Sequence, residues 1–547
     1  MELRFRAHLG WVLVSALLVT GLLLGLQASA VGDGRRGAGP AILNVTRPDR
    51  FLGNNGWAHP HLGTTQMHAL ADLAQTCQVF APNLELLGAG PGSVTEQQSQ
   101  IIAAPAGLEA SEQFSQTIYL PVVYQAFGAY RPLSFGIQLY RVNSTSTGII
   151  EESGAGWVRM PLSWVAIEPV DTTPQHYRWD AGLEAELVAY AGKGVRVILT
   201  LTSNPPWAAD FPGGPVHEAD ADELVEFLQA VVARYGAAPY NVKHWEMYNE
   251  PDNGDLGYAS VGWGYFGDDP QAYVDLLEAV YQPIKDVDPE AQVLFGGIAY
   301  DRWEPDGPFV ESFLDLVLGE MQANGRYPFD MMNFHYYPIF RANWEAYGTD
   351  IIGKANFIRA KLLSYGAGKP LICTEAGLWS DCRDPDDEVI CSSYEEQGRY
   401  VPQLYARGDA ADLEINVWFM LVDSENPYDL KHGLLETNLE FKRSYTAYQV
   451  LAEQLASAEY VRTLGLNETG SEQIEAYEFR EKEGSERIIV AWSNDDANHT
   501  MALAGSCLTS TDKYGVEGAP VCDGDDGRGD GVIQVSIGPS PVYLRLP

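Results

Sequence analysis

HWEMYNEPD, residues 244–252, is the stretch that decides the fold. It begins with the pattern of a short buried strand and ends in Asn249, Glu250 and Pro251, so an amide and a carboxylate follow the strand directly. Proline biases the residue before it away from the helical conformation. Glu250 is therefore expected to stay at the end of its strand, with its side chain held at the mouth of the sheet that the strand joins.

Similar short apolar runs, separated by amphipathic helical patterns, recur on both sides of this stretch. The predicted strands are Phe135–Leu139, Trp157–Met160, Arg196–Leu201, Val242–Met247, Ala291–Phe295, Met331–His335, Leu371–Thr374 and Ile415–Phe419. The predicted helices are Ala181–Ala191, Ala221–Tyr235, Gln271–Lys285, Phe309–Met321, Ile358–Tyr365 and Lys442–Leu455. Eight strands alternating with helices between residues 131 and 456 predict an α/β fold, the closed parallel (β/α)8 TIM barrel. A doubly wound open sheet is the alternative, but no Gly-rich phosphate loop follows the first strand.

The segments that flank the barrel differ from it in pattern. Residues 31–130 lack sustained periodicity and are rich in Gly, Ala, Pro, Gln and Ser, so we expect a mostly flexible spacer of low order. After residue 456, strand patterns replace the helices, and examples are Gln473–Phe479, Arg487–Trp492, Val532–Ile537 and Val542–Leu546. Residues 457–547 are therefore predicted to form a small antiparallel β-sandwich.

The first 30 residues have the order of a secretory signal peptide. Arg4 and Arg6 precede the apolar run Trp11–Leu26, and the small residues before and at Ala30 follow it. An uncleaved membrane anchor is the alternative, but the run is short for a transmembrane span. We expect cleavage near Ala30, a secreted product, and no membrane span once the signal is removed.

The six cysteines are consistent with an exported chain, since disulfides persist outside the cytosol. Cys382 and Cys391 lie close together in a loop-like segment, as do Cys507 and Cys522, and we predict these two pairs as disulfides. Cys373 lies in an apolar strand and is predicted to be a buried thiol. No Cys/His spacing is typical of a zinc site.

The charge balance excludes some partners. The chain has 35 Lys and Arg residues against 74 Asp and Glu residues, which gives a net charge of −39. Nucleic acid and anionic membrane surfaces repel so acidic a protein, so neither is expected as a partner.

Two carboxylates follow predicted strands on different sides of the barrel. Glu250 follows the strand at 242–247, and Glu375 follows the strand at 371–374. Catalytic groups of such barrels gather at the C-terminal ends of the strands, so both carboxylates are expected at one mouth. With carboxyl groups about 5–5.5 Å apart, one can attack an anomeric carbon while the other protonates the leaving oxygen. The pair therefore predicts retaining hydrolysis of O-glycosidic bonds.

Two neighbours are expected to support the pair. Asn249 can hydrogen-bond the sugar 2-hydroxyl, a contact that strengthens in the transition state. Arg159, in the second strand, can lower the pKa of Glu375 and keep it ionised as the nucleophile. Glu250 must act first as an acid and later as a base, so its pKa is expected to fall once the charge on Glu375 is consumed.

The order of these motifs resembles the clan A glycoside hydrolases, the retaining (β/α)8-barrel superfamily, over about residues 131–456. The resemblance rests on WVRMP with Arg159, NEP with Asn249 and Glu250, FHYY with His335 and Tyr337, CTEAG with Glu375, and VWFM with Trp418. It implies that Glu250 is the acid/base, that Glu375 is the nucleophile, and that the other residues bind the sugar. VRMP and His-x-Tyr resemble the cellulase-type family, whereas NPPWA, which contains Trp207, resembles the β-xylosidase and α-L-iduronidase family.

Other functions remain as alternatives. A non-catalytic carbohydrate-binding surface protein would have the same barrel, but the intact pair of glutamates speaks against it. A metal-dependent hydrolase would need clustered ligands at the strand ends, where His335 is the single histidine. Residues 523–531 are dense in hard oxygen ligands, yet they lack the full calcium-loop pattern, and an acidic turn is preferred. We therefore predict a carbohydrate partner, no metal and no cofactor.

Overall fold

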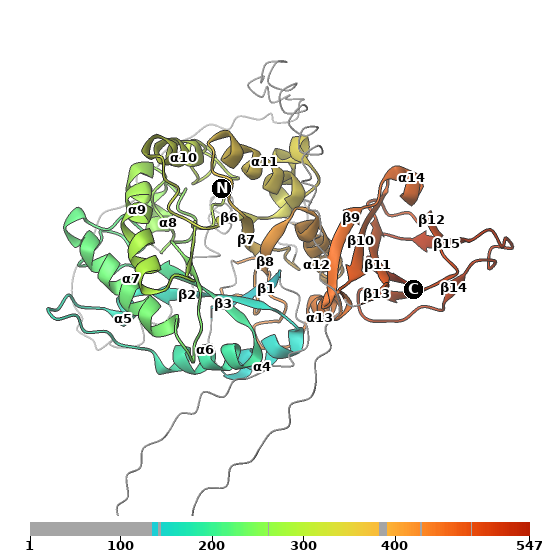
Figure 1. The fold of residues 1–547 in the computed structure, drawn as a ribbon, viewed down its shortest axis with the longest axis horizontal. Helices are drawn as coiled ribbons and strands as arrows, with labels where there is room; N and C mark the ends of the chain where they lie inside the picture. The colour runs from blue at the N-terminus through green and yellow to red at the C-terminus, as the bar shows by residue number, and fades with distance from the viewer. Residues whose placement is uncertain (1–133, 141–143, 261, 382–390, 427–428, 483) are drawn as a thin grey trace, which may run out of the picture. The chain divides into compact units, whose positions relative to one another are not determined.

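The computed structural model describes residues 134–140, 144–260, 262–381, 391–426, 429–482 and 484–547 (Figure 1). The predicted signal peptide, the predicted spacer at 31–130 and Cys382 lie outside these residues. Among the helices that the structure describes, none combines the length and apolar character that crossing a membrane requires.

Eight parallel strands form one sheet in the order β5-β4-β3-β2-β1-β8-β7-β6. Their bounds are β1 Phe135–Gln138, β2 Trp157–Ser163, β3 Arg196–Thr202, β4 His244–Glu246, β5 Gln292–Leu294, β6 Met332–Tyr336, β7 Leu371–Ala376 and β8 Leu413–Trp418. Two isolated parallel bridges, Leu294 with Met331 and Ile298 with Phe334, join β5 to β6. The predicted barrel is thus confirmed, and the open-sheet alternative is wrong.

Helices surround these strands on the outside (Figure 1). The helices of the barrel are α4 Ser144–Ser153, α5 Trp164–Ile167, α6 Ala181–Lys193, α7 Ala221–Tyr235, α8 Leu256–Ala259, α9 Pro270–Val287, α10 Phe313–Asn324, α11 Ile351–Ser364, α12 Tyr394–Ala410 and α13 Arg443–Leu455. Short 3-10 turns η1 Glu218–Asp220, η2 Pro338–Asn343 and η3 Glu345–Tyr347 lie between them. Helix α7 has the predicted bounds because its apolar residues form one buried stripe, with acidic residues in the first turn and Arg234 in the last.

The sequence prediction lacks helices α4 and α12 and begins α11 seven residues late, at Ile358. Helix α12 contains Pro402 and two glycines, which weaken a helical pattern. Its glycines have a packing reason: a Cβ at Gly398 would lie 2.6 Å from the Tyr514 hydroxyl, and one at Gly408 would lie 2.5 Å from Asn416. Tertiary packing therefore overrides the local propensity there. Helix α10 also begins at Phe313, four residues later than predicted.

Antiparallel sheets follow the barrel, as predicted. One has the order β14-β13-β16-β11-β10-β9, and β12 pairs with β15. The bounds are β9 Ala458–Thr463, α14 Leu466–Thr469, β10 Ile474–Glu481, β11 Arg487–Ser493, β12 His499–Ala504, β13 Cys507–Asp512, β14 Val521–Cys522, β15 Val532–Ile537 and β16 Val542–Leu546. Their own apolar cluster includes Ile489, Met501 and Leu544.

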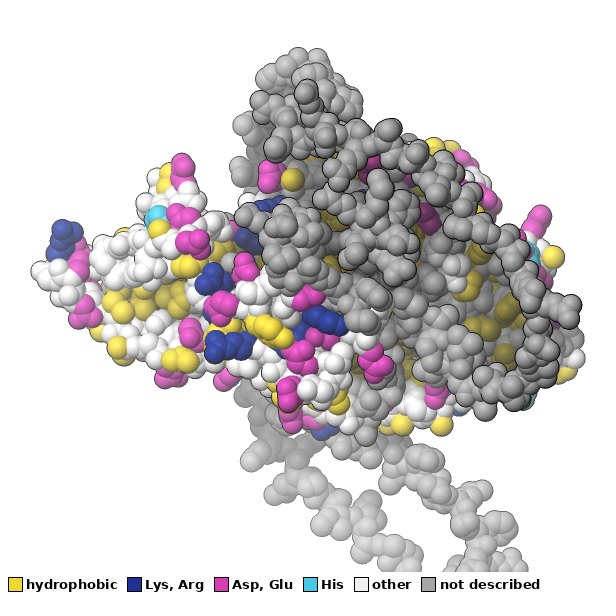
Figure 2. Space-filling model, turned by 180° about the vertical axis from the view of Figure 1, so that it is seen from behind, with side chains coloured by type: hydrophobic (Ala, Val, Ile, Leu, Met, Phe, Trp, Pro, Cys, Tyr) yellow, Lys and Arg dark blue, Asp and Glu magenta, His cyan; other side chains and the backbone are white. Residues whose placement is uncertain are grey.

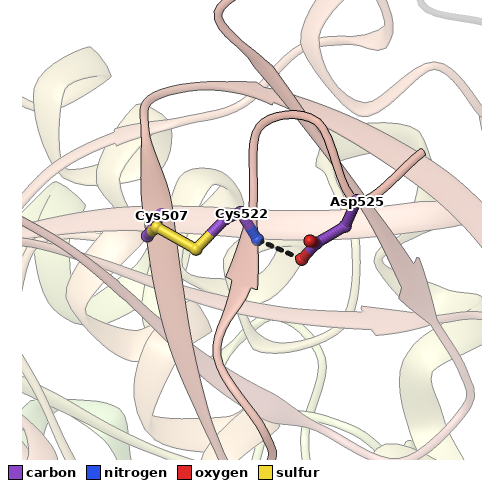
Figure 3. Close-up of a disulfide and its surroundings, with 3 residues drawn as sticks. All are labelled: Cys507, Cys522 and Asp525. Atoms are coloured by element: carbon purple, nitrogen blue, oxygen red, sulfur yellow. Dashed lines mark hydrogen bonds between the residues drawn. A yellow bond between two sulfur atoms is a disulfide. The ribbon is translucent and has the colours of Figure 1, made fainter. Parts of the chain in front are cut away.

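The cysteines that the structure describes agree with the prediction. Cys507 is bonded to Cys522, and an Asp525 oxygen accepts a hydrogen bond from the backbone N–H of Cys522 at 2.7 Å (Figure 3). Cys373 is a buried free thiol. Cys391 is disulfide-bonded.

Buried charges connect the barrel to the C-terminal sheets. Arg407 of α12 donates to Asp350 of the barrel at 3.0 Å and, through two nitrogens, to Glu475 of β10 at 2.7 and 2.8 Å. Its guanidinium also lies over the ring of Trp492, 5.1 Å from the ring centre. Because Arg407 is buried, these contacts form part of the protein interior and not a surface ion pair.

Acidic side chains are scattered across the face shown in Figure 2, with fewer Lys and Arg side chains between them. On the coloured part of this face the acidic side chains therefore do not gather into one patch.

Candidate active site

Two strand ends bring the predicted carboxylates together. Glu250 follows β4, and Glu375 is the fifth residue of β7, one residue beyond the predicted end of that strand. Both side chains are buried, and one oxygen of each lies within 4.8 Å of the other and of a ring nitrogen of His335. The barrel thus places a glutamate pair and a histidine in one compact group.

The backbone around Glu250 is strained. Tyr248 has a φ of 66° and Glu250 a φ of 49°, a region that non-glycine residues seldom adopt and that costs about 1–3 kcal/mol each. As predicted, Glu250 does not adopt the right-handed helical conformation. It is not extended, however, but has a left-handed backbone conformation, which the proline alone does not explain. Hydrogen bonds hold it there: the N–H of Glu250 donates to the carbonyl of Gly297 at 3.0 Å, and that of Gly264 donates to the carbonyl of Asn249 at 2.6 Å.

Glu375 has two donors on its carboxylate. The hydroxyl of Tyr337 donates to Oε1 at 2.6 Å, and Nη1 of Arg159 donates to Oε2 at 3.3 Å. Burial raises the pKa of Glu375, while Arg159 and Tyr337 oppose that rise. Arg159 thus lowers the pKa of Glu375 as predicted, but burial has the larger effect, so the net shift is upward.

Glu250 has a different environment. Nδ1 of His335 lies 3.0 Å from its Oε1, and its Oε2 has no hydrogen-bond partner among the described residues. Burial and the charge of Glu375 raise its pKa well above the ordinary value, whereas burial lowers the pKa of His335 and keeps its ring neutral. A Cβ at Gly297 would lie 2.1 Å from Nε2 of His335, so only glycine leaves room for that ring. These surroundings suit Glu250 to be the protonated member of the pair.

Sequence reasoning missed Glu246, which is fully buried beneath the pair. Nε and Nη2 of Arg159 donate to its two oxygens at 2.6 and 2.9 Å, so Glu246 is the main partner of Arg159. Its other donors are the side chains of Thr200, Asn333 and Thr374 and the N–H of Gly297. Nη2 of Arg159 also donates to Oδ1 of Asn249 at 2.8 Å, which leaves the amide N–H groups of Asn249 as donors for a ligand. Arg159 thus connects Glu375 in β7 to Asn249, the residue before Glu250.

A pocket opens above the carboxylate pair. It is lined by Glu250, Trp263, Ala299, Asp301, Arg302, Pro308, Phe309, His335, Tyr337, Phe340, Glu375, Trp379, Leu430 and His432. Of the predicted sugar-binding residues, His335 and Tyr337 belong to this lining, whereas Arg159, Asn249, Trp207 and Trp418 lie outside it. Trp418 is fully buried and donates to the carbonyl of His432 at 3.1 Å, and Trp207 packs edge-on against Trp164. The aromatic residues that line the pocket come from the loops after β4 to β8.

Glu250, His335 and Glu375 are also the one group of side chains in the described part of the chain that could hold a metal ion. The positive charge of Arg159, whose guanidinium lies 3.3 Å from an oxygen of Glu375, would repel a divalent metal ion at this position. The arrangement therefore favours a carboxylate pair. In the acidic segment 523–531, Asp523 accepts from the N–H of Asp530 at 3.1 Å, a turn contact of the kind expected.

Comparisons with known proteins agree with this geometry. Residues 137–403 match the family model for cellulase, glycosyl hydrolase family 5. A family 39 glycoside hydrolase from the gut symbiont Bacteroides cellulosilyticus WH2 is 20% identical, with a TM-score of 0.58 over 77% of this chain and 82% of that chain. A GH30 endoxylanase from Clostridium papyrosolvens C71 is 12% identical, with a TM-score of 0.52 over 77% and 97%. A glucosidase from Croceicoccus marinus is 16% identical, with a TM-score of 0.53 over 77% and 96%. At these identities the solved structures show a shared fold. No curated protein gives a significant sequence match.

Proposed function

Because the barrel of this chain is that of a clan A glycoside hydrolase, a clan of retaining O-glycosyl hydrolases, we propose a secreted enzyme that cleaves β-linked oligo- or polysaccharides by double displacement. Secretion is supported by the charged, apolar and small-residue order of the first 30 residues.

The distance between the glutamates carries the proposal. Oxygens of Glu250 and Glu375 lie within 4.8 Å of each other. Retaining enzymes have carboxyl groups about 5–5.5 Å apart, whereas inverting enzymes need about 6.5–9.5 Å to admit a water. An oxygen–oxygen separation below 4.8 Å is in keeping with the shorter spacing of retaining enzymes, which suits direct attack by a carboxylate.

The surroundings of the two glutamates support a division of roles between them. Glu375, with donors from Arg159 and Tyr337, attacks the anomeric carbon as its bond to the leaving oxygen breaks, and Glu250 gives its proton to that oxygen. The ester on Glu375 carries no charge, so one cause of the raised pKa of Glu250 disappears. Glu250 can then take a proton from water, which attacks the anomeric carbon and releases Glu375 as a carboxylate.

The pH dependence of kcat/KM is expected to be bell-shaped. Glu250 must be protonated, so activity falls as pH rises through its raised pKa; Glu375 must be ionised, so activity falls as pH drops through its own pKa. The two apparent values belong to the pair. Glu250→Gln should remove the alkaline limb on aryl glycosides with good leaving groups, which need no acid. An unchanged alkaline limb in that variant would give the acid role to another group.

Trapping of the glycosyl-enzyme tests the function. We expect one of a panel of activated 2-deoxy-2-fluoro β-glycosides to label wild type, because the fluorine slows both steps and the activated leaving group restores the first. Intact mass should show one added sugar, and peptide mapping should place it on Glu375. Glu375→Gln should not be labelled. Failure of every panel member, together with no turnover of any polysaccharide tested, would contradict the proposal.

A further inference from the structure

Arg302 is a positively charged side chain in the pocket of a protein whose net charge is −39. It follows β5, lines the pocket, and is the one Lys or Arg among the described lining residues. Its side chain makes no hydrogen bond or ion pair to any residue that the structure describes. The ionised groups that chiefly shift the pKa of Glu250 are Glu375, Asp252, Arg159 and Lys354, so Arg302 is not the counter-charge of the catalytic acid.

The backbone that presents Arg302 is fixed from both sides. The fully buried Asp252 accepts hydrogen bonds from the N–H groups of Ala299 at 3.1 Å and Tyr300 at 2.7 Å. The fully buried Lys354 donates to the carbonyl of Ala299 and, at 2.7 Å, to Asp301. Two opposite buried charges therefore clamp residues 299–301, and Arg302 leaves this rigid segment at a defined point.

A second hydrogen-bond donor, the indole N–H of Trp263, lines the same pocket. Trp263 is 6% exposed, and its indole N–H has no hydrogen-bond partner among the described residues. Its ring is stacked with those of Tyr258 and Phe309, which fixes its orientation. The carboxylate of Asp301 is already bonded to Lys354 and to the indole of Trp344, so it does not neutralise these donors.

We propose that Arg302 and Trp263 form a subsite for an anionic substituent, a carboxylate or a sulfate, on the sugar of the leaving group. A guanidinium binds such groups through paired, charge-assisted hydrogen bonds, and an indole N–H adds a third donor. We place the subsite on the leaving-group side of the scissile bond because Glu250 protonates the leaving oxygen. Trp263 follows Glu250 in the same loop, and Arg302 follows the adjacent strand β5. The inference rests on the proposed function.

Matched aryl glycosides test the subsite. Two substrates share the glycone that labels Glu375 and differ in a 3-carboxyphenyl or an isosteric 3-carbamoylphenyl leaving group. Wild type should prefer the carboxylate in kcat/KM by about tenfold to a hundredfold. Arg302→Gln should abolish this preference and leave the carbamoyl substrate within about twofold of wild type, because the variant loses only the charged contact. Arg302→Lys should keep part of it. Arg341→Gln, at an exposed arginine outside the pocket lining, should keep all of it.

Calorimetric binding of glucuronate, glucose 6-sulfate and glucose supplies a readout independent of turnover. If glucuronate alone binds more tightly than glucose, the subsite is specific for a carboxylate. If both anions bind more tightly than glucose, it is a general anion site. In either case the advantage over glucose should be lost in Arg302→Gln. If neither anion binds better than glucose and the carboxyphenyl substrate has no advantage, the inference is overturned while turnover of the neutral substrate upholds the proposed function. If no glycoside is turned over, the proposed function fails, and the binding comparison still decides the subsite.

Discussion

Glu375→Gln is expected to lower kcat/KM by about 10⁴-fold or more, because the amide cannot form the glycosyl ester. The fold should persist, since the amide oxygen can still accept from the hydroxyl of Tyr337, and Arg159 keeps its two-point contact with Glu246. Steady-state kinetics on an aryl glycoside, beside a circular dichroism spectrum, checks both statements.

A matched control separates this loss from a general effect of replacing a buried glutamate. Glu186 in α6 is also buried and bonded to a tyrosine, Tyr190, but lies outside the pocket lining, so Glu186→Gln should retain near wild-type activity. Added azide should partly rescue Glu375→Ala, whose shortened side chain leaves room for the small anion, and should yield a glycosyl azide of inverted configuration. Retention of more than a few per cent of activity without azide would show that Glu375 is not the nucleophile.

Glu246→Gln is expected to have the largest effect on stability. The change leaves the buried guanidinium of Arg159 without its two-point partner and turns an amide N–H₂ group toward donors that now lack an acceptor. Removing one member of a buried ion pair costs about 3–5 kcal/mol. The free energy of unfolding from urea titration followed by tryptophan fluorescence gives the measurement.

Glu151→Gln provides the comparison for Glu246→Gln. Glu151 pairs with Lys193 at 2.7 Å, but both side chains are about half exposed, and loss of such a pair costs at most about 1 kcal/mol. Similar losses in the two variants would mean that the Arg159–Glu246 pair contributes no more than a surface contact. Glu246→Gln should also lower kcat, because Arg159 would no longer be fixed against Glu375.

The parts of the fold that the sequence predicted are those with strong local patterns. Strand β3 is a run of apolar and β-branched residues, and helix α7 has a continuous apolar stripe, so both are recognisable without a structure. Helix α12 is not recognisable from its sequence. Its glycines Gly398 and Gly408 are required by close contacts with Tyr514 and Asn416, which come from distant parts of the chain. Such contacts leave no local signal.

The proximity of the two glutamates was predictable because Glu250 and Glu375 stand where strands end. The polar layer beneath them was missed, although a signal existed. Side chains two apart in a strand share a face, and each polar residue of this layer lies two residues after another inward-facing one. The pairs are Trp157 with Arg159, Ile198 with Thr200, His244 with Glu246, Met331 with Asn333, and Ile372 with Thr374. Which of these groups meet depends on the register between strands, which the sequence alone does not supply.

Aromatic residues near strand ends were the least predictable part of the site. Trp207 and Trp418 pack into the interior, whereas Trp263 and Trp379 line the pocket. Position after a strand does not distinguish these cases, because the path of each loop decides which ring faces the sugar.

The guanidinium of Arg407 makes the C-terminal sheets a poor candidate for a portable module. Truncation near residue 457 would remove Glu475 and the ring of Trp492 and leave Asp350 as the remaining ionic partner of that guanidinium. Domain shuffling by recombination, in nature or in the laboratory, would therefore have to move residues 134–547 as one cassette. A lineage that exchanged its terminal sheets would need a compensating change at Arg407 in the same step.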